Sequence, residues 1–351
     1  MGTAEWAAQP PPGRVETGAD PKTPESRVLF TRFIRRRNFS GFAFWVSSPP
    51  EICSTIATRA RDFAEAGGYS QSLALADYSP DTIGLFREKQ WLPERPVSFP
   101  GKREFKILFL GANPSDHALC GEVEHWTQIQ IRPGLPDGPG VPVLPEPGEP
   151  FSHSPLYGFL TSNPAYAGTG FQAETGIHLP ALTAGRRLQQ VQQALNAVGI
   201  GLEPLSLRAP GAAEAGFFRV AMRGGLEESE SAGYGTFVKN LKCVLNAEAS
   251  ALEQWQNKEK NPLEDRITRS IALMRGARSL GYAELLTFLS FARVGVHLGR
   301  FPASWMARLE NLRIRCQPFH CTALLQTKIS QNEEDIFRAQ AVRAELEGLE
   351  T

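Results

Sequence analysis

Residues 157–182, YGFLTSNPAYAGTGFQAETGIHLPAL, are the stretch of this chain that says most about its fold. The Gly168-Thr169-Gly170 run predicts a turn, and the stretch ends in His178 to Leu182 (HLPAL). Glycine lets backbone amides approach a ligand closely, so this turn is a candidate element for binding an anion.

The same stretch resembles the pattern Y-G-x-L-T-S-C-P-x-N-x-G-T-G-L-R-A-x-x-x-x-H-L-P-A-L of the ATP:guanidino phosphotransferases. Its HLPAL ending is similar to that of the bacterial protein-arginine kinases within the family. Two chemically active positions differ. Asn163 stands in place of the family's cysteine, and Gln172 stands in place of an arginine that binds phosphate.

A second matching segment lies near the N-terminus, where VLFTRFIRRRNFSGFAF (28–44) resembles V-L-S-S-R-I-R-L-A-R-N-L-x-G-F-P-F. Arg32 and Arg37 match, and the resemblance implies a nucleotide-binding role for both. The second phosphate-binding arginine of the family is replaced by Ile34.

The third segment, GEVEHWTQIQIRPGL (121–135), resembles N-E-E-D-H-L-R-I-Q-x-x-x-P-G-L. His125 matches and is a nucleotide-binding candidate, whereas the catalytic carboxylate of the family falls on Val123 and an arginine falls on Thr127. Glu122 and Glu124 flank Val123. If the segment is a strand, both side chains face away from the site, but a shift of one residue brings either one in.

These replacements matter because phosphoryl transfer spreads negative charge over the transferring group. The resemblance implies five arginines and Mg²⁺ around that charge, with ATP as phosphate donor. Three of these arginines become Ile34, Thr127 and Gln172, while Arg32 is kept and Arg208 is a candidate for the fifth. Each preorganised donor of this kind contributes about 3–4 kcal/mol to lowering the barrier.

The candidate catalytic residues are therefore Glu122, Glu124 and Asn163, none of which matches a family residue of that role. The guanidinium of an acceptor has a pKa above about 12, so its orientation or deprotonation calls for a carboxylate. Asn163 can form a hydrogen bond with a guanidinium but carries no charge. Gln172 remains a candidate nucleotide contact through its amide.

The C-terminal third carries a further resemblance. LEDRITRSIALMRGARSLGYAELLTFLSFARVGVHLG (263–299) is similar to a helical segment of the protein-arginine kinases. Residues 334–339 (EDIFRA) resemble R-D-x-x-R-A, which in those kinases binds phosphoarginine at a regulatory site. Asp335 and Arg338 are i, i+3 neighbours on a helix, so they form either a regulatory site or an ordinary ion pair. Glu334, in place of the first arginine, favours the ion pair.

Composition sets wider limits. The 351 residues carry 37 basic and 37 acidic side chains, which gives no global field for nucleic acid or an anionic membrane. No apolar run reaches the ~20 residues of a membrane helix. The five cysteines are scattered, as in a reduced cytoplasmic protein, and Cys316, His320 and Cys321 have no partner cluster to complete a metal site.

For the fold we expect an α+β protein. Residues 1–25 are predicted to be a disordered leader, and residues 26–255 a phosphagen-kinase catalytic domain, an antiparallel sheet flanked by helices. Residues 256–346 are predicted to form a small helical domain. Strands are predicted at 105–111 and 117–131, and helices at 187–198 and 333–346. The Pro/Gly-rich segment 133–150 is predicted to be a loop, with no regular helix across 136–148.

For function we expect a pseudokinase, which keeps the fold as a binding or regulatory protein. We expect it to form a homo- or heterodimer, and its partner to be a protein substrate or an active kinase relative. Two alternatives remain open. One is an active kinase that phosphorylates protein arginine or a small guanidino compound. The other is a purely structural dimerisation partner in protein quality control.

Overall fold

The fold is organised around an antiparallel sheet. The computed structural model describes residues 3–8, 20–94, 101–139, 151–206, 211–222, 229–327 and 330–347. Within these residues the sheet has eight strands in the order β2-β3-β4-β5-β1-β8-β10-β9, and every neighbouring pair is antiparallel. The strands are β1 (Val28–Arg37), β2 (Gln71–Ala74), β3 (Ile107–Leu110), β4 (Asp116–Cys120), β5 (Trp126–Pro133), β8 (Phe171–His178), β9 (Ile200–Pro204) and β10 (Phe217–Met222). A separate hairpin pairs β6 (His153–Ser154) with β7 (Gly158–Phe159).

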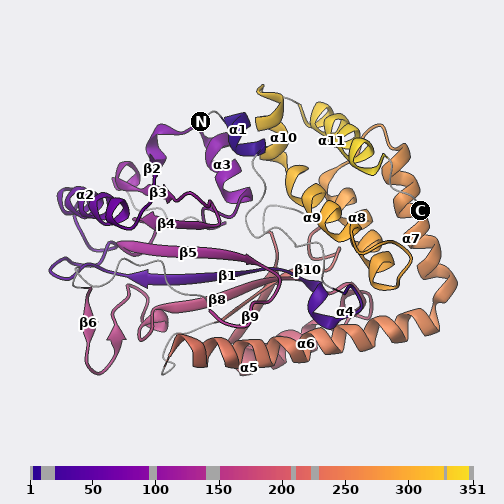
Figure 1. Ribbon diagram of the computed structural model, residues 1–351, viewed down its shortest axis with the longest axis horizontal. Helices are drawn as coiled ribbons and strands as arrows, with labels where there is room; N and C mark the ends of the chain where they lie inside the picture. Colours follow the sequence, from indigo (N-terminus) through magenta and orange to yellow (C-terminus); the bar gives the residue numbers. More distant parts are fainter. Residues whose placement is uncertain are drawn as a thin grey trace.

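Helices flank this sheet and follow it (Figure 1). Those that precede the C-terminal region are α1 (Thr3–Ala8), α2 (Pro50–Ala66), α3 (Pro80–Glu88), α4 (Pro180–Ala184), α5 (Leu188–Ala197) and α6 (Glu230–Lys258). The C-terminal helices are α7 (Lys260–Gly276), α8 (Tyr282–His297), α9 (Trp305–Arg315), α10 (Pro318–Leu325) and α11 (Gln331–Leu346). The expectation of an antiparallel sheet flanked by helices, with a helical C-terminal region, is confirmed.

Strand β1 lies near the middle of the sheet and presents two chemically different faces, because successive side chains of a strand point to opposite sides. Phe33 and Arg35 point towards α6, where Phe33 packs on Tyr234 and Arg35 pairs with Glu230 at 2.8 Å. Arg32, Ile34 and Arg36 point to the opposite side, which we call the Arg32 face. Ile34 belongs there to the apolar cluster that also holds residues of α8, α9 and α11.

The segment 117–131, predicted as one strand, is a hairpin instead. Strands β4 and β5 are joined by a turn over residues 121–125. Gly121 has φ +84, and a Cβ there would lie 2.5 Å from the ring of Trp45, so the chain can reverse at this point only with glycine. The turn removes the strand alternation that was assumed for Glu122 and Glu124.

The predicted leader is partly structured. Thr3–Ala8 form the short helix α1, and Ala7 is buried in the cluster that also contains residues of α10. TAEWAA contains good helix formers and no proline, which accounts for this difference from the prediction. Residues 9–19 lie outside the described part of the chain.

The remaining boundaries follow local chemistry. Strand β5 ends at Pro133, the described residues 134–139 contain no helix, and residues 140–150 of the predicted loop lie outside the description. Helix α5 ends before Gly199, whose φ of +71 closes it as predicted. Helix α6 runs through Lys258, so the expected boundary at 255/256 falls inside a continuous helix.

The HLPAL motif is anchored by a buried carboxylate of α6. Glu248 is 0% exposed and accepts hydrogen bonds from the backbone amides of Ala181 and Leu182, both at 2.8 Å. Burial raises the pKa of Glu248 to about 7, against the opposing effects of these two amides and of Arg27. A group whose pKa is raised in the folded state binds more protons there than in the unfolded state.

We therefore expect the contribution of Glu248 to stability to be complete below pH 4.5 and to decline as pH rises to about 7. The shift corresponds to about 3 kcal/mol. Urea unfolding of wild type and Glu248→Gln across pH 4.5–8 measures it, because glutamine has no charge to titrate. From pH 4.5 to 8, the free energy of unfolding of Glu248→Gln minus that of wild type should increase by about 3 kcal/mol. A difference that does not change with pH would contradict the prediction.

Candidate functional site

The Arg32 face brings together Ile34, Thr127 and Gln172, the three positions at which this chain lacks an arginine that the resemblance implies. Ile34 is opposite Gln172 of β8 and Ile129 of β5, and Thr127 is opposite Arg36. Ile34 is 3% exposed and packed in the apolar cluster of this face. The Gln172 amide donates to the carbonyl of Met222 at 2.9 Å. These three positions therefore share one face of the sheet, where they present an apolar, a hydroxyl and an amide group.

Arg32, the arginine kept from the family pattern, is paired with a carboxylate. It lies opposite Glu174 of β8, and its Nε is 3.6 Å from the Glu174 carboxylate. Both residues are buried. Burial tends to raise the pKa of Glu174, but Arg32, Arg219 and Arg36 outweigh it and hold that pKa below its usual value. Glu174 is therefore ionised and shares its charge among these arginines.

Arg37, the other predicted nucleotide-binding arginine, lies on the opposite face from Arg32. Its guanidinium stacks over the Phe159 ring at 3.6 Å and donates to the carbonyls of Arg36 and Thr169, at 2.8 and 3.0 Å. Residues an odd number apart on a strand point to opposite sides, so Arg32 and Arg37 do not converge on one ligand. Arg37 holds the turn before β8 in place.

The Gly168–Gly170 turn is closed by contacts within the protein. The Gly168 amide donates to the carbonyl of Phe159 at 3.1 Å, and the Gly170 carbonyl accepts from the Arg36 amide at 2.9 Å. Gly170 has φ +63, and a Cβ there would lie 2.5 Å from a guanidinium nitrogen of Arg37. Glycine is thus required here for packing, and the amide of Gly168 is not directed at a ligand.

The two glutamates that flank Val123 are both engaged elsewhere. Glu122 is 3.4 Å from the ammonium group of Lys106. The Glu124 carboxylate accepts from the Asn38 amide at 2.6 Å, and from the backbone amide and hydroxyl of Ser162 at 2.9 and 2.8 Å. Glu124 is 1% exposed. In this arrangement Glu124 joins three chain segments instead of facing an acceptor.

His125 and Asn163 also have internal roles. The Nδ1 of His125 accepts from the amide of Phe39 and its Nε2 contacts the carbonyl of Ala43, both at 3.0 Å. Burial lowers the pKa of His125 to about 4, so the ring is neutral. Asn163 caps a short 3₁₀ turn, η4 (Pro164–Tyr166), by accepting from the amide of Ala165 at 3.1 Å. Arg208 lies outside the described residues.

This geometry can be compared with known proteins. Residues 146–251 match the family model of the ATP:guanido phosphotransferase C-terminal catalytic domain, and residues 260–351 match that of the protein-arginine kinase McsB C-terminal domain. The chain is 25% identical over 334 residues to a protein-arginine kinase of Shouchella clausii, and the match covers 91% of each chain. It is 27% identical over 344 residues to that of Bacillus subtilis, covering 93% of this chain and 92% of the relative.

The chain belongs to the ATP:guanido phosphotransferase family. Solved structures agree in fold. A lombricine kinase superposes with a TM-score of 0.53 at 14% identity, covering 72% of this chain and 76% of that one. A duplicated taurocyamine kinase from Schistosoma mansoni gives a TM-score of 0.52, also at 14% identity, covering 86% of this chain and 45% of that one.

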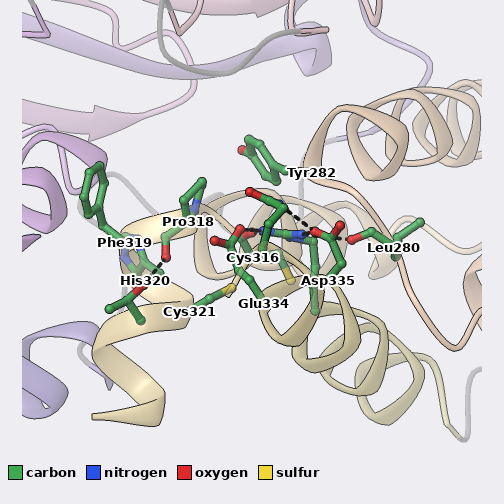
Figure 2. Close-up of polar contacts among 12 residues, drawn as sticks. Leu280, Tyr282, Cys316, Pro318, Phe319, His320, Cys321, Glu334 and Asp335 are labelled. Carbon is green, nitrogen blue, oxygen red and sulfur yellow. Dashed lines mark hydrogen bonds and ion pairs between the residues drawn. The ribbon is translucent and has the colours of Figure 1, made fainter. Parts of the chain in front are cut away.

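The C-terminal motif that resembles the phosphoarginine site of this family is an internal ion cluster (Figure 2). Arg338 is 0% exposed and donates to Asp335 at 2.5 Å and to Glu334. It also donates to the carbonyls of Cys316 and Leu280, at 2.8 and 2.9 Å. The Glu334 carboxylate thus occupies one of the donors of Arg338. The contacts match the expected ion pair of Asp335 and Arg338, although the arginine is buried and the aspartate only partly exposed.

Two site residues were missed by the sequence analysis. Arg36 lies on the Arg32 face where the family pattern has alanine, and Glu174 lies two residues after Gln172 on the same face of β8. The signal was available, because the period of two along β1 places Arg32 and Arg36 together. The family pattern specifies no charged residue at either position, so neither was identified from it.

Other expectations concern metals and membranes. Within the described ranges no group of three or more His, Cys, Asp and Glu residues is placed to hold a metal ion. His320, once considered as a ligand, contacts Glu88 at 2.7 Å, and all five cysteines are free thiols. None of the described helices is long and apolar enough to cross a membrane.

Proposed function

We propose that this protein is a pseudokinase of the protein-arginine kinase type, a binding or regulatory protein with little or no phosphoryl transfer from ATP to a guanidinium. The observation that carries the proposal is the placement of Glu122 and Glu124. The first contacts Lys106, and the second is enclosed by Asn38 and Ser162. Neither is placed to take over the acceptor role at Val123.

The donor side supports the same conclusion. Isoleucine and threonine carry no charge, and the amide of Gln172 is a much weaker partner for phosphate than a guanidinium. Removing two such stabilising groups lowers the rate by about 10⁴ if their effects are additive. The missing carboxylate adds to this loss, because its two neighbours in the sequence, Glu122 and Glu124, are engaged by Lys106, Asn38 and Ser162.

The ligand expected from the family is ATP with Mg²⁺, since the relatives are ATP-dependent kinases. The arginines of the Arg32 face suit the phosphates of such a ligand. The described part of the chain offers no cluster of protein ligands for the metal. Mg²⁺ would therefore come with the nucleotide, held chiefly by phosphate oxygens and water.

The decisive test is transfer itself. Purified protein is incubated with MgATP and either free arginine or an arginine-rich protein, and acid-labile phosphoarginine is measured by ³¹P NMR and mass spectrometry. The Bacillus subtilis protein-arginine kinase serves as the positive control. We expect no product above background, because the acceptor carboxylate and three cations are missing. A rate within about tenfold of the control would rule out the pseudokinase proposal and favour an active kinase.

A further inference from the structure

We propose that Arg293 of α8 and Arg27 of η1 hold a small monovalent anion, of the size of chloride, in the interior of the molecule. The 3₁₀ turn η1 (Pro24–Arg27) leads directly into β1. The inference goes beyond the proposed function, because it concerns residues outside the nucleotide and acceptor positions.

Four buried side chains from three parts of the chain meet here, and we call them the Arg293 cluster: Arg27, His178, Arg293 and His297. His178 begins the HLPAL motif, and its Nε2 lies 2.8 Å from the hydroxyl of Ser290 on α8. Arg293 and His297 are i, i+4 neighbours on α8. The Nδ1 of His297 lies 2.7 Å from the carbonyl of Pro21, in the segment that leads to Arg27.

Arg293 is a buried charge without a close counter-ion. Glu310 of α9 lies 3.8 Å from its Nη1, too far for a hydrogen bond, and Glu310 already forms two bonds with Arg313, at 2.9 and 2.6 Å. Arg293 is 2% exposed, and burial lowers its pKa to about 10, so it stays charged at neutral pH. Within the described residues its Nε and Nη1 have no hydrogen-bond partner. Such a charge is costly unless an anion accompanies it.

Arg27 adds a second charge to the same place. It is 4% exposed, and its charge contributes to the lowered pKa of Arg293, so the two guanidinium groups are near neighbours. In the described part of the chain the Nε of Arg27 also has no hydrogen-bond partner. The carboxylate that acts on Arg27 is Glu248, whose oxygens accept from the backbone amides of the HLPAL motif. With a pKa of about 7, Glu248 is only partly ionised at neutral pH.

The two histidines do not supply the missing negative charge. Burial lowers the pKa of both rings, that of His297 to about 3, so both are neutral. The Nδ1 of His297 donates to Pro21, because a carbonyl can only accept, and its Nε2 is then an acceptor. The donors for an anion are therefore the Nε and Nη1 of Arg293 and the Nε of Arg27. The Nε2 of His297 suits water instead, so water is the alternative occupant.

A single small anion fits these donors best. One acceptor atom with a full negative charge forms charge-assisted hydrogen bonds with N–H groups of both guanidiniums and offsets the charge that Arg293 leaves unpaired. A phosphate would bring further oxygen atoms that three N–H groups cannot all satisfy. Water would satisfy the N–H groups but leave the charge uncompensated.

Bromide, which replaces chloride and scatters anomalously, locates the ion directly. In wild-type crystals grown with sodium bromide, an anomalous difference peak is expected beside the Nε and Nη1 of Arg293 and the Nε of Arg27. In solution, exchange of gluconate for chloride at equal ionic strength should raise the midpoint of thermal unfolding by about 2 °C, the shift for an ion at about ten times its Kd. Arg293→Gln and Arg27→Gln should each lose this shift, because a guanidinium donor is removed.

The control variant is Arg300→Gln, an exposed arginine that pairs with Glu264 and should keep the full chloride shift. Far-UV circular dichroism confirms that each variant is folded. The inference is overturned if the bromide map shows only a water molecule at the Arg293 cluster, or if Arg293→Gln keeps the wild-type shift. Should Arg293→Gln fail to fold, the bromide map of wild type and the melts of Arg27→Gln decide the question.

Discussion

Arg338→Ala is expected to lower the free energy of unfolding by about 3–5 kcal/mol, because it leaves a buried carboxylate without its counter-ion. Arg338 is fully buried, and Glu334 is 8% exposed. The same guanidinium donates to the carbonyls of Cys316, at the end of α9, and Leu280, just before α8. Alanine would remove these side-chain bonds from α11 to both segments and leave the backbone bond from the Leu280 amide to the Asp335 carbonyl, at 3.0 Å.

Urea unfolding followed by far-UV circular dichroism measures this loss. The matched control is Arg269→Ala in α7, which removes an i, i+4 pair with Asp265 at 3.5 Å, where 71% of the arginine side chain is exposed. An exposed pair of this kind contributes about 0.5 kcal/mol or less. Similar losses in the two variants would show that the Arg338 cluster contributes no more than a surface pair.

The cluster also shows which part of such a site is visible in a sequence. The i, i+3 spacing of Asp335 and Arg338 was enough to predict that they are neighbours. The partners that bury Arg338 are backbone carbonyls at Leu280 and Cys316, 58 and 22 residues away along the chain. Carbonyls have no sequence signature, so the burial could not be predicted.

The elements of the fold were predicted where local chemistry decides them. Gly199 ends α5 because its positive φ suits glycine, and Ser330 with Glu333 forms a capping box at the start of α11. The prediction of a single strand over 117–131 was wrong because a contact distant in sequence decides the structure there. The reversal at Gly121 depends on the ring of Trp45, which is distant in sequence, so a continuous strand was the natural prediction.

The candidate site was predicted in part for a related reason. The family pattern placed Ile34, Thr127 and Gln172 in one site, and strand register brings them to one face. The pattern also grouped Arg32 with Arg37, although an odd separation on β1 sends them to opposite sides. On that face Arg32, which the pattern marks, lies together with Arg36, which it does not.

Glu124→Ala is expected to lower the free energy of unfolding by about 3–5 kcal/mol, because buried donors lose a charged partner. The carboxylate joins Asn38, at the end of β1, to Ser162, in the segment between β7 and η4. Asn38 also accepts from the amide of His125 at 3.0 Å, so the β4–β5 turn belongs to the same network. Three segments would lose their common contact at once.

Chemical unfolding gives the size of the loss, and hydrogen exchange at residues 160–166 shows where the structure loosens. Glu65→Ala, on the exposed side of α2, is the control and should change stability by no more than about 0.5 kcal/mol. Glu124→Gln should fall between the two, because its amide oxygen can still accept while the charge is gone. A stable Glu124→Ala protein with unchanged exchange would contradict the network.

The same variant links stability to the MgATP binding that the proposed function implies. Tyr166 ends η4, four residues after Ser162, and its ring covers the guanidinium of Arg36. If Glu124 holds this segment in place, Glu124→Ala should also weaken MgATP binding, although Glu124 forms no hydrogen bond with Arg36 and acts on it only through its charge. Glu124 would then be a positioning residue: the turn has no carboxylate at Val123, and the carboxylate of the next residue fixes the segment that carries Tyr166. Weakened unfolding stability with unchanged MgATP affinity would separate the two roles and leave Glu124 a purely structural residue.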